Sequence, residues 1–177
     1  MKYVALLRGI GPGNPNMKND KLRGVFERLG FENVRSVISS GNILFDTPET
    51  NIQALEDDIQ SALQLDLGIN GGTVIRDEAA IKDFVATKPF KKAEHSPSTY
   101  LTVTFFKGKY IPTVDLPHKS DRGYEILSYD KKINAICSVT DISYGKTPDL
   151  MTWLEKQYSK DITTRTMKTV ERIASKF

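Results

Sequence analysis

The stretch Tyr3-Val-Ala-Leu-Leu-Arg-Gly-Ile10 decides the fold, because an apolar run is followed at once by an arginine and a glycine-rich loop. A short run that is apolar at every position predicts a strand buried on both faces. After the loop, residues at i, i+3, i+4 and i+7 form the apolar face of a helix, namely Leu22, Val25, Phe26 and Leu29. Gly30 ends that helix, with Phe31 beyond it as in a Schellman cap.

A β-hairpin follows the first helix. Its strands are Val34-Arg-Ser-Val-Ile38 and Ile43-Leu-Phe45, and they flank the turn Ser39-Ser-Gly-Asn42. Gly41 supplies the conformational freedom that such a turn needs.

A second helix and a fourth strand complete this unit. The pair Thr50 and Gln53 predicts a capping box, and the helix carries the apolar residues Ile52, Leu55, Ile59 and Leu63. The last strand is Gly72-Thr-Val-Ile75. Residues 1–76 therefore have the order βαββαβ, which is the ferredoxin-like split motif.

The second half, residues 77–177, loosely repeats this order. Asp77 is expected to cap a helix that Pro89 stops, and residues 88–98 form a connector rich in Pro, Ser and Lys. Strands are predicted at 100–106, 124–127 and 133–137, and helices are expected to open at Thr147-Pro148 and at Thr163-Thr164. We therefore expect an α+β protein of two tandem ferredoxin-like units, the second βαββα-like, with helices packed on antiparallel or mixed sheets in one compact body.

Composition narrows the class of protein. In 177 residues, 39% hydrophobic and 27% charged side chains are typical of a globular protein rather than a disordered or fibrous one. The single cysteine, Cys137, excludes an internal disulfide framework and suits a reducing compartment. The N-terminal apolar run is too short for a signal peptide or a membrane span, so we expect a cytoplasmic protein without membrane contact.

Charge is unevenly distributed along the chain. Residues 1–90 hold 10 Lys and Arg against 12 Asp and Glu, whereas residues 91–177 hold 15 against 10. The basic second half permits a nucleic-acid partner without requiring one. Lysine pairs such as Lys131-Lys132 are more often a solvated surface than a recognition patch, and no RNA-binding sequence signature is present.

The split motif predicts where a site would lie. Its first two strands run parallel, so the end of the first strand and the hairpin after the second share one edge. This loop edge comprises Arg8 to Asn16 and Ser39 to Asn42, with Asn70 and Gly71 nearby. Loop amides beside a guanidinium favour an anion such as phosphate or carboxylate. An equally consistent interpretation is structural, in which the glycines make tight turns and Arg8 is a structural hydrogen-bond donor.

Arg165 poses a second question. In the first turn of a helix its charge would oppose the positive end of the helix dipole and would need a compensating anion. A local partner such as Asp161 is the simpler prediction, and the alternative is that Arg165 and Thr164 face the same ligand as Arg8.

Known catalytic and metal motifs are missing from the sequence. Gly9, Gly11 and Gly13 fall one residue short of the dinucleotide fingerprint, and no Walker motif follows them. His95 and His118 read as surface residues, and Cys137 reads as a small buried hydrophobe. The run Glu56-Asp57-Asp58 reads as the solvated face of its helix. We predict no metal site, no cofactor and no catalytic residues, and leave open whether the protein is an enzyme.

These motifs together resemble the bacterial domain-of-unknown-function 1697 family. The resemblance covers essentially the whole chain and rests on Tyr3 to Ile10, the helix end Leu22 to Phe31, Val34 to Phe45 with its Ser40-Gly41-Asn42, and Thr163-Thr-Arg165. It implies a small cytoplasmic protein and transfers no activity, substrate or cofactor.

Two motifs depart from the family pattern. Where members usually read R-G-I-N-V-G-G and T-T-R-N-W-N-T, this chain has Arg8-Gly-Ile-Gly-Pro-Gly-Asn14 and Thr163-Thr-Arg-Thr-Met-Lys-Thr169. If the replaced residues contact a ligand, the resemblance implies that this protein binds a different ligand or binds it more weakly.

Binding of a small anionic or phosphate-bearing ligand at the loop edge is the leading hypothesis for function. The candidate binding residues are Arg8, Gly9, Gly11, Gly13, Ser40, Gly41, Asn42, Thr164 and Arg165. The alternatives are a nucleic-acid module that uses the basic second half and a protein interaction or oligomerisation domain without a ligand. The sequence does not predict the oligomeric state.

Overall fold

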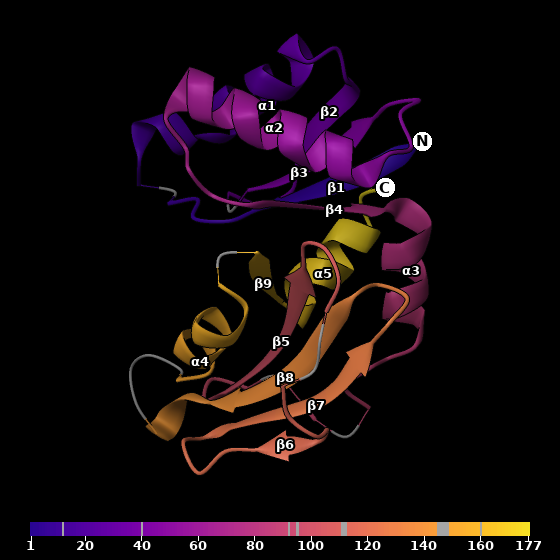
Figure 1. Cartoon of the computed structure of the whole chain (residues 1–177). Helices are drawn as coiled ribbons and strands as arrows, with labels where there is room; N and C mark the ends of the chain where they lie inside the picture. Colours follow the sequence, from indigo (N-terminus) through magenta and orange to yellow (C-terminus); the bar gives the residue numbers. More distant parts are fainter. Residues whose placement is uncertain are drawn as a thin grey trace.

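The computed structural model describes residues 1–11, 13–39, 41–91, 93–94, 96–110, 113–144, 149–159 and 161–177. In these residues the chain forms five α-helices and two antiparallel sheets, so it is a mixed α+β protein (Figure 1). No helix in the described part of the chain combines the length and apolarity needed to cross a membrane.

The first unit has the predicted element order. It consists of β1 (Lys2–Leu7), a 3-10 turn η1 (Pro15–Met17), α1 (Asn19–Arg28), β2 (Glu32–Ser36), β3 (Asn42–Asp46), α2 (Ile52–Leu67) and β4 (Thr73–Asp77). The strand order is β2-β3-β1-β4, with every neighbouring pair antiparallel. As a result, the end of β1 meets the β2–β3 turn, and the main-chain N–H of Leu7 donates to Gly41 O at 2.8 Å.

Helix ends in this unit follow from local chemistry. Gly30 adopts a φ of +82°, and the Phe31 N–H donates back to Phe26 O, which confirms the Schellman cap. The predicted capping box of α2 is wrong, because Asn51 occupies the N-cap position and its side chain accepts the Ala54 N–H. Asn is among the best N-cap residues, which explains the shift by one residue.

The second unit differs from the expected repeat. It comprises α3 (Glu78–Ala86), β5 (Thr99–Phe106), β6 (His118–Lys119), β7 (Tyr124–Asp130), β8 (Ala135–Asp141), a 3-10 turn η2 (Ile142–Tyr144), α4 (Asp149–Tyr158), β9 (Ile162–Thr166) and α5 (Met167–Ala174). The sheet order is β6-β7-β8-β5-β9. Between β5 and β7 the described residues contain the short β6 and no helix, so the tandem ferredoxin-like repeat is not confirmed.

Strand β9 was not predicted, and the expected helix start at Thr163-Thr164 is wrong. The segment pairs antiparallel with β5, and α5 begins only at Met167, after Thr166 accepts the Thr169 N–H as N-cap. Three threonines and an isoleucine in five residues favour a strand, because β-branched side chains fit an extended backbone. The other predicted helix start, Thr147-Pro148, lies outside the described residues.

Three buried cores hold the layers together. One lies between the first sheet and α1 and α2, around Phe26, Phe45 and Ile59. A second joins the inner faces of the two sheets to α3 and α5, and includes Leu6 and Phe105. The third lies under α4. The inner face of the first sheet is thus covered by the second half, as its all-apolar strands predicted.

Candidate functional site

Arg165 joins the two units at the loop edge. From β9 its Nε donates to Asn42 Oδ1 at 2.6 Å, and its Nη2 donates to Leu7 O at 2.8 Å and Gly41 O at 3.3 Å. Its Nη1 donates to Thr163 Oγ1 and to Thr164 O. One guanidinium therefore ties the end of β1 and the first hairpin to the second sheet.

Asn42 receives this contact from within the core. Its side chain is fully buried, and its Nδ2 donates to Val37 O at 3.0 Å across the hairpin. Burial lowers the pKa of Arg165 to about 10, so the guanidinium remains charged at neutral pH. A charged donor on a buried amide oxygen is a strong hydrogen bond, which indicates that this contact fixes the hairpin.

The expected placement of Arg165 is therefore corrected. It lies on β9 rather than in the first turn of α5, so the helix dipole imposes no need for a compensating anion. Asp161 uses its main-chain oxygen to accept the Lys107 N–H. Thr164 shares a hydrogen bond of 2.8 Å with Thr104 on β5, which directs its hydroxyl into the second sheet.

Arg8 also reaches the second unit. Its Nη1 donates to Ile162 O at 3.0 Å, and its Nη2 forms an ion pair of 2.5 Å with Glu155 on α4. The Arg8 side chain is 19% exposed and the Glu155 side chain is 50% exposed. The carboxylate thus approaches the guanidinium from the solvent side, where its contribution to stability is small.

The glycine loop beside Arg8 presents main-chain donors. The Gly11 N–H contacts Met17 Sδ at 3.1 Å, and Asn14 caps the turn Pro15–Met17. Within the described part of the chain, the N–H groups of Gly9, Ile10 and Gly13 donate to no protein acceptor. Main-chain N–H groups without a protein acceptor can donate to an anion.

Two glycines at this edge are required by close packing. A Cβ on Gly71 would lie 1.9 Å from Arg8 O, and a Cβ on Gly41 would lie 2.5 Å from Ile10 Cγ1. Gly41 also adopts a φ of +72°, as the hairpin predicted. Ser40, the remaining candidate residue, lies outside the described residues. The structure therefore brings Arg8, Gly41, Asn42 and Arg165 together and directs Thr164 elsewhere.

A cavity of about 550 Å³ opens between the two units on the other edge of the first sheet. Its charged lining includes Glu56 from α2, Arg76 from β4, and Lys107 and Lys132 from the second unit. Arg76 donates to Ile133 O at 2.6 Å and to Phe106 O at 2.7 Å, and burial lowers its pKa. Arg76 therefore acts as a second connection between the units.

Glu56 is not part of a solvated helix face, as the sequence had indicated. It is 4% exposed and accepts the Ile75 N–H at 2.9 Å, which covers the open edge of the sheet at β4. Burial raises the pKa of Glu56 above its ordinary value, and the Ile75 hydrogen bond opposes that shift. The available signal was periodicity, because Ile52, Glu56 and Ile59 fall on one helical stripe.

Replacing Glu56 with glutamine tests this placement. The amide oxygen can still accept the Ile75 N–H, while the cost of burying a charge disappears. Because the folded-state pKa of Glu56 is raised, its contribution to stability is present below about pH 4.5 and is lost as pH rises through the folded-state value. The melting temperature of Glu56→Gln relative to the parent protein should therefore increase between pH 4 and 8. A constant difference in thermal unfolding would contradict this.

The remaining candidates behave as structural residues. Cys137 is fully buried, and burial raises its pKa to about 12, so its thiol is a poor nucleophile. His118 stacks on Trp153, with ring centroids 5.9 Å apart, and His95 lies outside the described residues. In the described residues no group of three or more His, Cys, Asp or Glu side chains could hold a metal ion.

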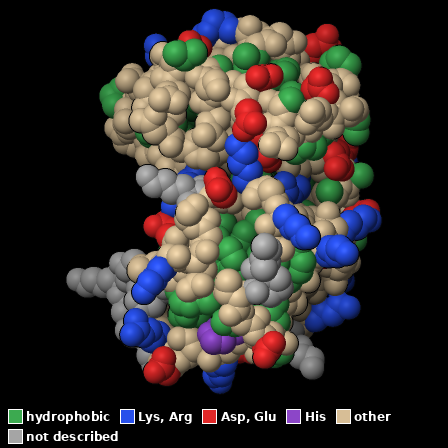
Figure 2. All heavy atoms as spheres, viewed as in Figure 1, with side chains coloured by type: hydrophobic (Ala, Val, Ile, Leu, Met, Phe, Trp, Pro, Cys, Tyr) green, Lys and Arg blue, Asp and Glu red, His purple; other side chains and the backbone are tan. Residues whose placement is uncertain are grey.

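Charges of the two halves meet at their junction. Lys107 of the second half pairs with Asp57 of the first at 2.8 Å, and within the second half Lys132 pairs with Asp83 at 2.5 Å. Figure 2 shows basic and acidic side chains side by side along this junction. Part of the basic excess of the second half therefore neutralises the acidic first half.

Comparisons with known proteins agree with this architecture. A solved structure, described as the structure of conserved bacterial protein SP0830 from Streptococcus pneumoniae, is similar at a TM-score of 0.74 and 22% identity, covering 98% of this chain and 97% of that one. At this identity the likeness shows the fold alone. A comparison with curated proteins finds no match.

The family comparison is more specific. Residues 1–130 match the family model described as "Protein of unknown function (DUF1697)". The match includes Arg8, the glycine loop and the first hairpin, but it ends before β9. Because it covers well over half of the sequence, the chain belongs to the DUF1697 family.

Proposed function

We propose that this protein binds a small anionic or phosphate-bearing ligand at the loop edge. The observation that supports the proposal is the set of main-chain N–H groups at Gly9, Ile10 and Gly13, which find no acceptor in the described residues and belong to the loop that follows Arg8. A phosphate offers several acceptor oxygens, which accept hydrogen bonds from main-chain N–H groups and from a guanidinium.

The roles of the two arginines differ in this proposal. Arg165 is held by main-chain oxygens and Asn42, so it positions the hairpin rather than contacting the ligand. Arg8 holds an exposed carboxylate, Glu155, that a ligand anion can replace. Arg8 therefore supplies the charge, and the loop supplies the neutral donors.

A thermal-shift screen with inorganic pyrophosphate, sugar phosphates, nucleotides and dicarboxylates tests the proposal. A ligand that binds the native state raises the melting temperature by mass action. Arg8→Ala should weaken binding of the best compound at least about tenfold, because a charge-assisted contact is lost. The variant's own melting temperature should fall by no more than about 3 °C, as expected for an exposed ion pair.

Arg28→Ala is the matched control. Arg28 forms a similarly short and exposed pair at 2.5 Å, which joins α1 to Asp66 on α2 within the first unit. Its loss should leave binding unchanged. Equal weakening by both variants, or no stabilisation by any compound, would contradict a ligand at the loop edge.

Glu155→Gln provides a test in the other direction. Removing the carboxylate leaves Arg8 without its competing anion, so binding of the same compound should tighten up to about fivefold. Isothermal titration calorimetry measures the change. Unchanged or weaker affinity would show that Glu155 does not occupy the ligand's position.

A further inference from the structure

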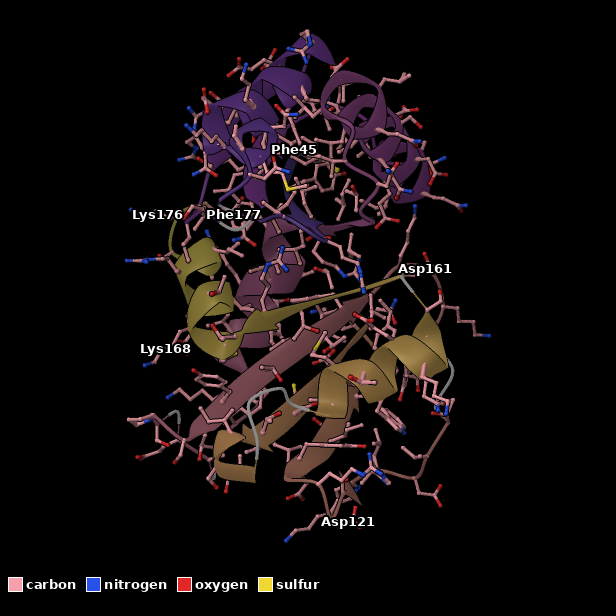
Figure 3. All side chains as sticks on the ribbon, turned by 90° about the vertical axis from the view of Figure 1, so that its left-hand side faces the viewer. Phe45, Asp121, Asp161, Lys168, Lys176 and Phe177 are labelled. Carbon is pink, nitrogen blue, oxygen red and sulfur yellow. The ribbon has the colours of Figure 1, made fainter. Side chains whose placement is uncertain are left out.

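A second cavity, of about 460 Å³, lies between the edge strand β2 and the end of α5. Its lining is Arg35, Ser36, Val37, Ile38, Leu44, Arg172 and Lys176. The basic residues come from opposite ends of the chain, yet all three face the same space. Figure 3 shows Lys176 just beyond the end of α5 and Asp161 at the opposite side of the molecule. Asp161 directly precedes Ile162, whose main-chain oxygen Arg8 contacts.

Among the described residues, the lining holds three cations and no carboxylate. The nearest acid on the same helix, Glu171, lines a different cavity beside α3. Elsewhere in the described chain, five cations lie within 2.8 Å of a carboxylate, namely Arg8, Arg28, Lys82, Lys107 and Lys132. In the described residues Arg35, Arg172 and Lys176 have no such partner.

The backbone of this cavity is strained. Ile38 has a φ of +61°, a conformation that a β-branched residue rarely adopts. Its side chain is nonetheless 39% exposed and lines the cavity, so burial in the core does not account for it. The conformation is held by Asn19, whose Nδ2 donates to Ile38 O at 3.1 Å. Strain maintained in this way is characteristic of binding sites.

We propose that the cavity between β2 and α5 is a second, independent site for a small molecule that carries a phosphate group and an apolar body. Arg35, Arg172 and Lys176 bind the phosphate oxygens, and Ile38 contacts the apolar body. This site shares no residue with the loop edge, so the proposal does not depend on the proposed function.

The chemistry of the lining selects this class of ligand. Three cations without a carboxylate favour a phosphate over a zwitterion or a sugar, because a positively charged group would find no partner. Ile38, which is 39% exposed, gives the cavity an apolar surface that favours an organic phosphate over a free inorganic ion. The same phosphate chemistry occurs in a phosphorylated metabolite and in a lipid headgroup, and the experiment separates these two sources.

Isothermal titration with phenyl phosphate and with inorganic phosphate provides the test. Phenyl phosphate should bind about tenfold more tightly than inorganic phosphate, because its ring is removed from water. Arg172→Ala and Lys176→Ala should each weaken phenyl phosphate about tenfold. Ile38→Gly should weaken phenyl phosphate and leave inorganic phosphate unchanged.

Lys168→Ala is the matched control, since Lys168 lies at the start of α5, whereas Lys176 lies just beyond its end (Figure 3). It should bind phenyl phosphate as the parent protein does. A loss confined to Arg8→Ala would place the phosphate at the loop edge and overturn the second site.

Two further measurements distinguish a phosphorylated metabolite from a lipid headgroup and from non-specific charge attraction. Binding to vesicles that contain an anionic phospholipid, with no binding of phenyl phosphate, would overturn a metabolite site in favour of a membrane surface. Equal loss of affinity in Lys168→Ala and Lys176→Ala would indicate diffuse charge attraction and would also overturn the proposal. Thermal unfolding of each variant verifies that it is folded.

Discussion

Replacing Arg165 with alanine should lower the free energy of unfolding by about 3 kcal/mol or more, because its charge-assisted hydrogen bonds to acceptors at the junction of the two units are lost together. The acceptors affected are Asn42 Oδ1, Leu7 O and Gly41 O, in two elements of the first unit. For a chain of this size the melting temperature should fall by about 10 °C. Thermal and urea unfolding measure both quantities.

Two variants distinguish the loss of the Arg165 hydrogen bonds from the loss of its positive charge alone. Arg165→Lys keeps the positive charge but lacks the planar fork, so it should recover less than half of the lost stability. Arg8→Ala removes an exposed pair with Glu155 and should cost no more than about 1 kcal/mol. If Arg165→Ala lowers the free energy of unfolding no more than Arg8→Ala does, Arg165 does not fix the hairpin to the second unit. A direct role in ligand binding is then the better interpretation.

The first unit was largely predictable because its signals are local. Apolar periodicity, a glycine C-cap at Gly30 and the turn at Gly41 each depend on residues within about ten positions. They therefore gave the element order and the edge at which β1 meets the hairpin. In the second unit, one segment has two conflicting local preferences. Thr163-Thr164 fits a helix N-cap, and its β-branched side chains also favour a strand. The pairing with β5, which the local sequence does not reveal, decides for the strand.

The site was less predictable because its contacts join distant segments. Nothing local to Arg165 indicates that Leu7 and Asn42, more than 120 residues away, accept its hydrogen bonds. For Glu56 the sequence did contain a local signal, because the residue lies on the apolar stripe of its helix. Its charge nevertheless favoured the prediction that it faces solvent. Burial with a main-chain partner at Ile75 reconciles the two.

Gly71→Ala should be comparably destabilising, by roughly 3 kcal/mol, although it removes no hydrogen bond. The added Cβ would lie 1.9 Å from Arg8 O and 2.9 Å from Arg8 C, so the main chain of the loop edge must move. Arg8 N donates to Gly72 O at 2.8 Å, and this contact resists such a shift. Thermal unfolding should show a fall of about 10 °C in melting temperature.

Gly11→Ala is the control for this prediction, because an added Cβ at Gly11 would meet no atom within 4 Å. It should change the melting temperature by no more than about 2 °C, as for an ordinary surface substitution. Since Gly71→Ala displaces the backbone that carries Arg8, it should also weaken any ligand at the loop edge while leaving the cavity between β2 and α5 able to bind phenyl phosphate. If the Gly71→Ala protein is as stable as the Gly11→Ala protein, the main chain of the loop edge can move at little cost in free energy. A main chain that moves so easily does not hold its N–H groups in fixed positions for an anion.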